Sequence, residues 1–418
     1  MMNYNIKLQN KDISAWKMMI LFIVSVYAQD VYSMYLYFAV VVVLTMKNTI
    51  SCFGVKAYAK NRYLSIFFIV ALGVTTLFFV LRRISWLEEM KAISYGLILT
   101  DSLFIYVQKP KVFEKGMRMI SGLIVASALY GIFEAIVSYN IFEQYFVADY
   151  IRGYYGTALY RIASIYMHPI VCGQIFLIGF WLVVYFYDKW IRTISLIVLI
   201  LGIYYTKSRS IWGGLAFSII IFGLVKVIDF FKEHKMQKKK LLYVLCTIGC
   251  IYVLYRIGIF DTIINNVCER ILAARGSKSE LIRQSMSMYT VNYMFRDASL
   301  FQKVFGYGLD SSKLWLDNSN VFMKAYDAID NSYLTILYEF GLFGLLTTVC
   351  LFIRKIIRCF YKKSNTYRLN NASVMAIVAC VIPLCFYDFY GWLPVYILFI
   401  YCVVSSNVPN YIRESEKR

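Results

Sequence analysis

Long apolar blocks, separated by short bursts of charged residues, follow one another along all 418 residues of the chain. A helix needs about 20 apolar residues to cross roughly 30 Å of hydrocarbon, and the blocks are of that order. The composition agrees, since 60% of the residues are hydrophobic and 16% are charged, whereas a soluble domain carries roughly 25% charged residues. The sequence therefore predicts an all-α polytopic membrane protein with about 12 transmembrane helices.

Twelve blocks are predicted to span the membrane. They lie at residues 15–29, 32–46, 63–81, 91–107, 117–138, 168–187, 190–205, 210–228, 241–258, 332–353, 372–388 and 391–407. One long segment, 259–331, separates the ninth block from the tenth. The chain is thus expected to consist of an N-terminal bundle of about nine helices (1–258), a long loop (259–331), and a C-terminal part with the last helices and a tail (332–418).

The basic residues predict the orientation of these spans. With both termini on the cytoplasmic side, 28 of the 44 Lys and Arg residues fall in inner segments, as the positive-inside rule requires. The 259–331 loop then lies outside the cytoplasmic membrane. The inner 28 are 20 Lys and 8 Arg, whereas the outer 16 are 6 Lys and 10 Arg. Because the arginine fork grips phosphate bidentately, this difference indicates an anionic phosphate ligand on the outer face.

Several classes of function are disfavoured by what the sequence contains. The net charge of +20 is dispersed between apolar blocks, so we do not expect nucleic acid as a partner. Most of the 10 cysteines lie in predicted spans, where they are expected to pack rather than form disulfides. The two histidines are too few for a His-rich metal site. No nucleotide-binding or Ser-His-Asp pattern occurs, so neither a metal nor a cofactor is expected.

Two polar patches flank predicted outer ends of spans. In the first, Arg161 precedes a span that begins at His168-Pro169, a typical start for a helix; the alternative is a helix start with an interfacial histidine. In the second, Ser208-Arg209 forms a tight turn between two spans. An arginine at a membrane boundary must snorkel, pair or bind an anion.

The long loop and its return to the membrane supply two more patches. The loop carries Arg270, Arg275 and Arg283, although solvated helix faces often carry such residues. Asp330-Asn331 would cap the tenth span, and Glu339 follows within it. A carboxylate at that depth needs a partner, for which we expect an arginine. Glu134 in the fifth span raises the same question.

The ordered set of motifs resembles the family of O-antigen ligases and Wzy-type O-antigen or capsule polymerases. The motifs, in chain order, are Arg161 with His168-Pro169, Ser208-Arg209, Gly306 and Gly308, Asp330-Asn331, and Glu339 with Gly341 and Gly344. Each motif alone is weak, and the resemblance covers roughly residues 150–350. Gly341 and Gly344 would permit close packing of helices.

The resemblance implies a metal-independent membrane glycosyltransferase of the C-class kind. Its donor would be an oligosaccharide on undecaprenyl pyrophosphate, and its partners membrane lipid, a chain-length regulator and a flippase. We expect Arg161, Arg209 and Arg283 to bind phosphate and Asp330 to act as the catalytic base. The expected substrate-binding set also contains His168, Arg270, Arg275 and Glu339.

Ligases of this family resemble "HN" at the position where this chain has Asp330-Asn331, so polymerisation of lipopolysaccharide or capsule repeat units is favoured over ligation. A ligase stays the alternative within the family. A flippase for lipid-linked oligosaccharides is the alternative of another class, although transporters often show repeated halves and this chain is lopsided.

Overall fold

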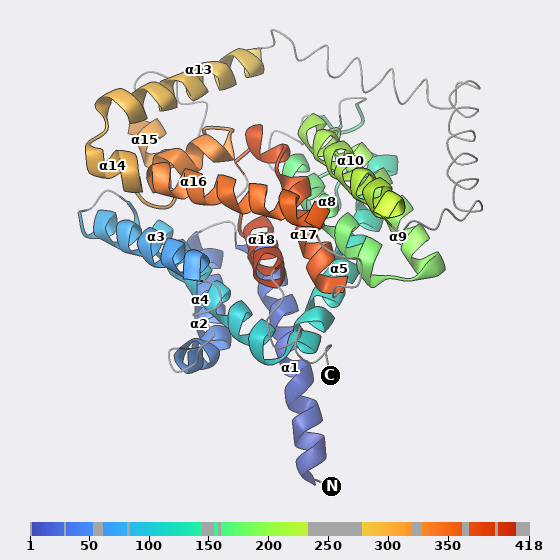
Figure 1. Ribbon diagram of the computed structural model, residues 1–418. Coiled ribbons are helices and arrows are strands. Elements are labelled where there is room, and N and C mark those ends of the chain that lie inside the picture. The colour runs from blue at the N-terminus through green and yellow to red at the C-terminus, as the bar shows by residue number, and fades with distance from the viewer. Residues whose placement is uncertain are drawn as a thin grey trace.

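The computed structural model describes residues 2–28, 31–52, 62–81, 84–143, 154–157, 160–232, 278–318, 328–361, 368–388 and 392–406, and in these ranges the regular structure is helical (Figure 1). Eleven of the twelve predicted spans coincide with helices. These are α1 (Met2–Tyr27), α2 (Val31–Cys52), α3 (Arg62–Val80), α4 (Trp86–Gln108), α5 (Pro110–Val137), α8 (Pro169–Phe186), α9 (Lys189–Tyr205), α10 (Arg209–Lys232), α16 (Ser332–Tyr361), α17 (Arg368–Cys380) and α18 (Leu393–Ser405). The predicted span at 241–258 lies outside the described residues.

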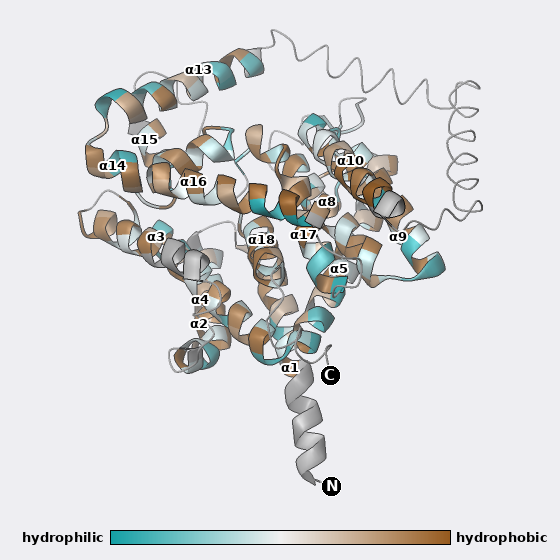
Figure 2. Cartoon of the chain, in the orientation of Figure 1, coloured by the Kyte–Doolittle hydropathy of each residue, from teal (hydrophilic) through white to brown (hydrophobic). Residues whose placement is uncertain are grey.

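Seven of the described helices are long and apolar enough to cross a membrane, and three shorter apolar helices accompany them. The second predicted span, at 32–46, is longer than expected, because α2 runs over 22 residues. Exposed apolar side chains lie along helices such as α2 and α10, and the hydropathy colouring shows that α10 is largely hydrophobic (Figure 2). A helix whose outward face is apolar is suited to lipid. The chain is therefore an all-α polytopic membrane protein.

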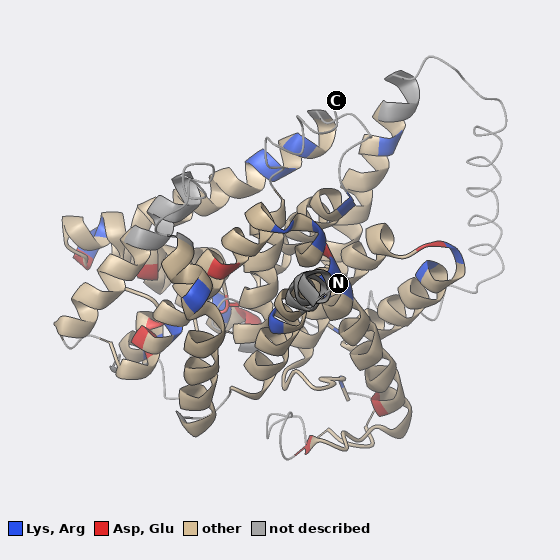
Figure 3. Cartoon of the chain, turned by 90° about the horizontal axis from the view of Figure 1, so that it is seen from below, with Lys and Arg blue, Asp and Glu red and all other residues tan. Residues whose placement is uncertain are grey.

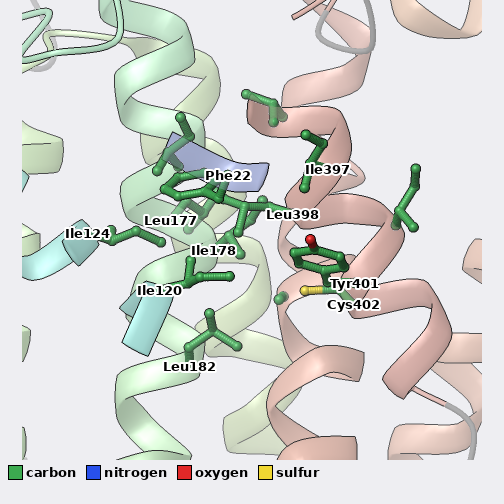
Figure 4. Packing of buried hydrophobic residues seen from close by; sticks show 14 of the residues in the cluster. Phe22, Ile120, Ile124, Leu177, Ile178, Leu182, Ile397, Leu398, Tyr401 and Cys402 are labelled. Atoms are coloured by element: carbon green, nitrogen blue, oxygen red, sulfur yellow. The ribbon is translucent and has the colours of Figure 1, made fainter. Parts of the chain in front are cut away.

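Helix α8 occupies the centre of the bundle. Fifteen of its 18 residues are buried, and it packs against α5, α9 and α17. Figure 4 shows the core that forms around it, with side chains from α1, α5, α8 and α18 pointing toward one another. The labelled members are Phe22, Ile120, Ile124, Leu177, Ile178, Leu182, Ile397, Leu398, Tyr401 and Cys402.

The helix ends gather on two opposite sides of the bundle. On one side, Tyr106 near the end of α4 donates to the carbonyl of Ser405 at the end of α18, and Arg358 of α16 donates to Asn370 of α17. All of these ends are predicted to be cytoplasmic. In the view from below, basic residues lie around α1 on this side (Figure 3). On the other side lie the ends that are predicted to be outer, including the start of α8, the start of α16 and the end of α17.

The described part of the predicted loop is folded rather than irregular. It forms α13 (Lys278–Asn292), a π-helical turn (Tyr293–Asp297), α14 (Leu300–Phe305) and α15 (Ser311–Asn318). These elements lie over α16 and beside α3 (Figure 1). A second buried cluster, which includes Met286, Met294 and Tyr338, joins them to α16. The loop is therefore packed on the membrane helices.

Candidate functional site

Three arginines predicted from separate motifs come together at the predicted outer side of the bundle. The charges of Arg161 and Arg283 both act on His168. Arg283 in turn repels Arg209, and Glu280 attracts Arg209. Residues more than 120 positions apart in the sequence thus form one electropositive group at the start of α8 and α10. Such a group is suited to an anion with several negative charges.

A buried carboxylate in α5 holds the segment that carries Arg161. Glu134 accepts hydrogen bonds from the backbone N–H of Ala163 at 3.0 Å, the N–H of Ser164 at 2.7 Å and the hydroxyl of Tyr160 at 2.6 Å. The sequence predicted that Glu134 needs a partner but did not identify it. The 160–164 segment is that partner. Because that segment is fixed on both sides of Arg161, the position of the arginine is fixed too.

Arg161 also caps a helix end. Its Nε donates to the carbonyl of Thr206 at 2.9 Å, at the C-terminal end of α9. A cation is favourable there because the carbonyls at a helix C-terminus carry partial negative charge. This bond ties Arg161 to the turn that leads into Arg209. In that turn the hydroxyls of Ser208 and Ser210 lie 3.2 Å apart.

His168 is a helix-capping residue at the start of α8. Its Nδ1 accepts a hydrogen bond from the N–H of Ile170 at 3.2 Å, so the ring proton lies on Nε2. Its ring stacks on Tyr387, with centroids 5.2 Å apart and an angle of 12° between the planes. Burial, together with Arg161 and Arg283, lowers the pKa of His168 to about 3. The imidazole is therefore neutral near pH 7, and it can donate a hydrogen bond without adding charge.

Arg283 of α13 forms an ion pair with Asp330, which lies just before the start of α16. The Nε of Arg283 lies 3.0 Å from Oδ2 of Asp330, and the side chains are 33% and 20% exposed. The neighbouring residue, Asn331, caps α16, because its Oδ1 accepts from the N–H groups of Tyr333 and Leu334. The sequence predicted this cap for the Asp330-Asn331 pair. The structure assigns it to Asn331 and leaves Asp330 to Arg283.

Glu339 holds the loop rather than facing solvent. The side chain is fully buried in α16. Its carboxylate accepts from the N–H of Asp310 at 2.7 Å and from the hydroxyl of Ser312 at 2.6 Å. The turn at 310–312 is thus a partner of Glu339 that the sequence did not predict. These contacts hold the loop on α16, and the substrate-binding role expected for Glu339 stays a prediction.

The predicted glycine motifs bring loop and helix into direct backbone contact. Gly306 has a φ of 78°, and a Cβ there would lie 2.2 Å from the carbonyl carbon of Glu339. Gly341 has a φ of 64°, and a Cβ there would lie 2.4 Å from the backbone of Val304. Only glycine fits such positions without strain. Gly341 therefore interrupts the helix and seats α14 on α16, whereas the sequence predicted only close packing of helices.

A second group of charges lies beside this junction and was not predicted. Lys91 of α4 pairs with the carboxylate of Asp310. Burial disfavours the charged carboxylate, but Lys91 and Lys313 outweigh that effect and lower the pKa of Asp310. The hydroxyl of Thr75 in α3 accepts from the N–H of Leu309 at 3.1 Å. Lys91 and Thr75 thus support the loop, although the first 110 residues of the chain carry none of the family motifs.

A further carboxylate of the site was also missed. Asp388 follows Tyr387 in the short connection between α17 and α18, a place that the sequence analysis assigned to the end of a span. The carbonyl of Tyr387 accepts from Ser332, two residues after Asp330. The Oδ1 of Asp388 is buried and has no hydrogen-bond partner among the described residues. A carboxylate next to an outer helix end would have been the signal for it.

Two predicted substrate-binding residues, Arg270 and Arg275, lie outside the described residues. The others, apart from Glu339, gather within the group described above.

Residues 194–349 match the model of a protein family described as O-Antigen ligase. By this match, residues 194–349 form a region of the O-antigen ligase family. Among curated proteins none matches the chain. Members of this family are membrane enzymes of the glycosyltransferase kind, and their substrates are lipid-linked polysaccharides.

The match to the ligase and polymerase family covers only part of the site. It includes Arg209, Arg283, Asp330 and Glu339, whereas Arg161, His168 and Asp388 lie outside residues 194–349. The charges of Arg161 and Arg283 nevertheless both act on His168. The fold therefore brings residues from both sides of the matched region to one place.

Proposed function

We propose that the protein polymerises the repeat units of a surface polysaccharide, either O-antigen or capsule. In this reaction the glycan on one undecaprenyl pyrophosphate is transferred to a lipid-linked acceptor repeat unit. The observation that carries the proposal is that Arg161 and Arg283 both act on the neutral His168, and that Arg283 also acts on Arg209. A membrane-bound pyrophosphate has the charge and the location to occupy such a group.

The chemistry needs two kinds of group. The bond between the anomeric carbon and the phosphate oxygen breaks, and arginines stabilise the negative charge that develops on the leaving pyrophosphate. The acceptor hydroxyl gives up its proton to a carboxylate as it attacks the same carbon. The site has both kinds, because Asp330 lies against Arg283 and Asp388 lies nearby.

Polymerisation is favoured over ligation by the residues before α16. Ligases of the family resemble His-Asn here, and this chain has Asp330-Asn331. The neutral imidazole of His168 comes from a different element, the start of α8. Ligation to a lipid core is the second candidate within the family.

The reaction is proposed to take place on the outer face of the cytoplasmic membrane, with both termini in the cytoplasm. The lysine-rich ends on the other side of the bundle support this orientation. We also retain the division into an N-terminal bundle (1–258), an outer loop (259–331) and a C-terminal part (332–418). A chain-length regulator and a flippase are the proposed protein partners.

A deletion strain tests the proposed function against both alternatives. Surface glycan from the strain is separated by gel electrophoresis, and lipid-linked glycan is extracted and sized. Single repeat units attached at the surface are the result expected for a lost polymerase. Long chains that stay unattached would instead identify a ligase. Single lipid-linked units trapped on the cytoplasmic side would identify a flippase.

A further inference from the structure

One carboxylate oxygen of Asp388 is buried in unusual surroundings. Its Oδ1 has no hydrogen-bond partner among the described residues. Burying a charged or polar group without a partner is unfavourable, and native proteins rarely do so without a functional reason. Asp388 as a whole is only partly buried. The unsatisfied Oδ1 therefore lies in the protein interior, although the residue as a whole also reaches the surface.

The neighbours of Asp388 place it within the proposed active site. Tyr387, the preceding residue, stacks on His168 and is bonded to Ser332. The acidic groups that act on Asp388 are Asp310 and Asp330, and the basic groups are Lys313 and Lys91. Asp388 thus directly follows the residue that stacks on His168, and it is close enough to Asp330 for the two carboxylates to repel each other.

Asp330 and Asp388 differ in the partners that their carboxylates have. An oxygen of Asp330 already accepts from Arg283 at 3.0 Å. A carboxylate that is committed to an arginine is a poor proton acceptor, because the cation stabilises its charged form. Asp388 has no such bond to a described residue. A buried carboxylate oxygen without a hydrogen-bond donor gains from taking up a proton, which is what a general base requires.

We propose that Asp388 is the general base of glycan transfer and that Asp330 positions Arg283. This inference rests on the proposed function. The acceptor O–H bond breaks and its proton passes to a carboxylate oxygen of Asp388. The hydroxyl oxygen then bonds to the anomeric carbon, and undecaprenyl pyrophosphate leaves with the electron pair of the broken C–O bond. The proton on Asp388 passes to water before the next turnover.

The pH dependence of the reaction follows from these surroundings. Burial, followed by the repulsion of Asp310 and Asp330, raises the pKa of Asp388 to about 7. A general base acts in its deprotonated form, so the rate of transfer should rise with pH through about 7 and then level off. His168 does not contribute to this rise, because its pKa is lowered to about 3.

The test compares two variants in one assay. Purified protein in detergent is given lipid-linked repeat units extracted from the deletion strain, and kcat and KM are measured from pH 5.5 to 8.5. For Asp388→Asn we expect a loss in kcat of about 100-fold or more, the scale of general-base catalysis, and the rise near pH 7 should disappear. For Asp330→Asn we expect a higher KM for the donor and an unchanged pH profile. Asp388→Glu, which keeps a carboxylate, should recover part of the activity.

The opposite pattern would overturn the assignment. If Asp330→Asn abolished the rise near pH 7 and Asp388→Asn kept it, the base would be Asp330. If wild-type protein did not elongate the units but transferred finished glycan to a lipid core, the polymerase proposal would fail. The same pH series, measured on that transfer, would still decide the role of Asp388. Asp188→Asn is the matched control, because this carboxylate is 70% exposed at the opposite end of the bundle.

A stability measurement needs no substrate and gives an independent result. Because the pKa of Asp388 is raised on folding, the folded state binds the proton more tightly, and its stability relative to Asp388→Asn must fall as pH rises through about 7. We therefore expect Asp388→Asn to melt at a higher temperature than wild type at pH 8.5, with a smaller difference at pH 6. A lower melting temperature at both pH values would show that Asp388 has a structural partner, and it would overturn the proposal.

Discussion

The charges around Arg209, the first residue of α10, favour a bound anion. It is exposed, it begins α10, and it is repelled by Arg283 and attracted by Glu280. Like charges brought together in this way repel each other, and a bound anion would relieve the repulsion. The clustering of arginines is therefore expected to weaken folding slightly and to favour a pyrophosphate ligand.

The proposed role of Arg209 depends on its shape as well as its charge. Lysine keeps the charge but loses the planar fork that holds two phosphate oxygens. We expect Arg209→Lys to lower kcat/KM for the lipid-linked donor roughly tenfold, and Arg209→Ala to lower it further, since a lost charged hydrogen bond costs about 1.5–3 kcal/mol. Arg192→Lys is the control, because Arg192 is exposed near the other end of α9. Equal polymer from wild type and both Arg209 variants would remove Arg209 from the phosphate site.

At the scale of the element, α16 and α14 are joined backbone to backbone. Each contributes a glycine with positive φ, and each glycine faces the main chain of the other element. The N–H groups of Tyr307 and Gly308 also donate to the carbonyls of Tyr338 and Glu339, at 3.1 and 2.8 Å. A junction of this kind allows no side chain, so its sequence requirements are strict.

Replacement of Gly341 by alanine tests this junction. The new Cβ would meet the backbone of Val304 at 2.4 Å, and the φ of 64° is strained for alanine. The strain alone costs on the order of 1–3 kcal/mol, so we expect a clear fall in melting temperature in detergent and poor recovery of monodisperse protein. Gly223→Ala is the control, because nothing lies within 4 Å of a Cβ at that position of α10. Wild-type stability for Gly341→Ala would mean that the junction is adaptable.

At the scale of the whole molecule, the two sides of the bundle have different chemistry. One side holds the ends of α4, α16 and α18 and the start of α17, and the other holds the arginines, His168 and the folded loop. The proposed orientation makes the first side cytoplasmic. A lipid-linked donor on the outer face of the membrane would then lie on the same side as the site.

Cysteine labelling checks this orientation. In a cysteine-free background, Gln284→Cys on the exposed face of α13 should react with a membrane-impermeant reagent in intact cells. Asp188→Cys, in the turn before α9, should react only after the membrane is ruptured. Reaction of Asp188→Cys in intact cells, with protection of Gln284→Cys, would invert the topology and move the arginines to the cytoplasmic side.

The sequence predicted the architecture well because lipid imposes a simple rule on helices. Apolar blocks of sufficient length had to become spans, and all eleven of those in the described residues are helical. Arg161, His168, Arg209 and Arg283 could be selected because polar residues at outer helix ends are few.

The rest of the site depends on contacts between distant segments, which a single sequence does not reveal. Asp388 was missed because its connection is too short to look like a loop, and its importance comes from Tyr387, His168 and Asp330 meeting around it. The helix break at Gly341 was missed because Gly341 lies inside a continuous apolar block. It becomes visible only when the main chain of α14 lies against it.

The support that α3 and α4 give to the loop has a consequence for engineering. Lys91 and Thr75 contact Asp310 and Leu309 from outside the region that the family shares. A fragment limited to residues 194–349 would lose these contacts together with the segment that carries Arg161. The shared region is therefore not an independently transplantable module. A chimera that exchanges it between relatives should retain activity only when the matching surfaces of α3, α4 and α5 are exchanged with it.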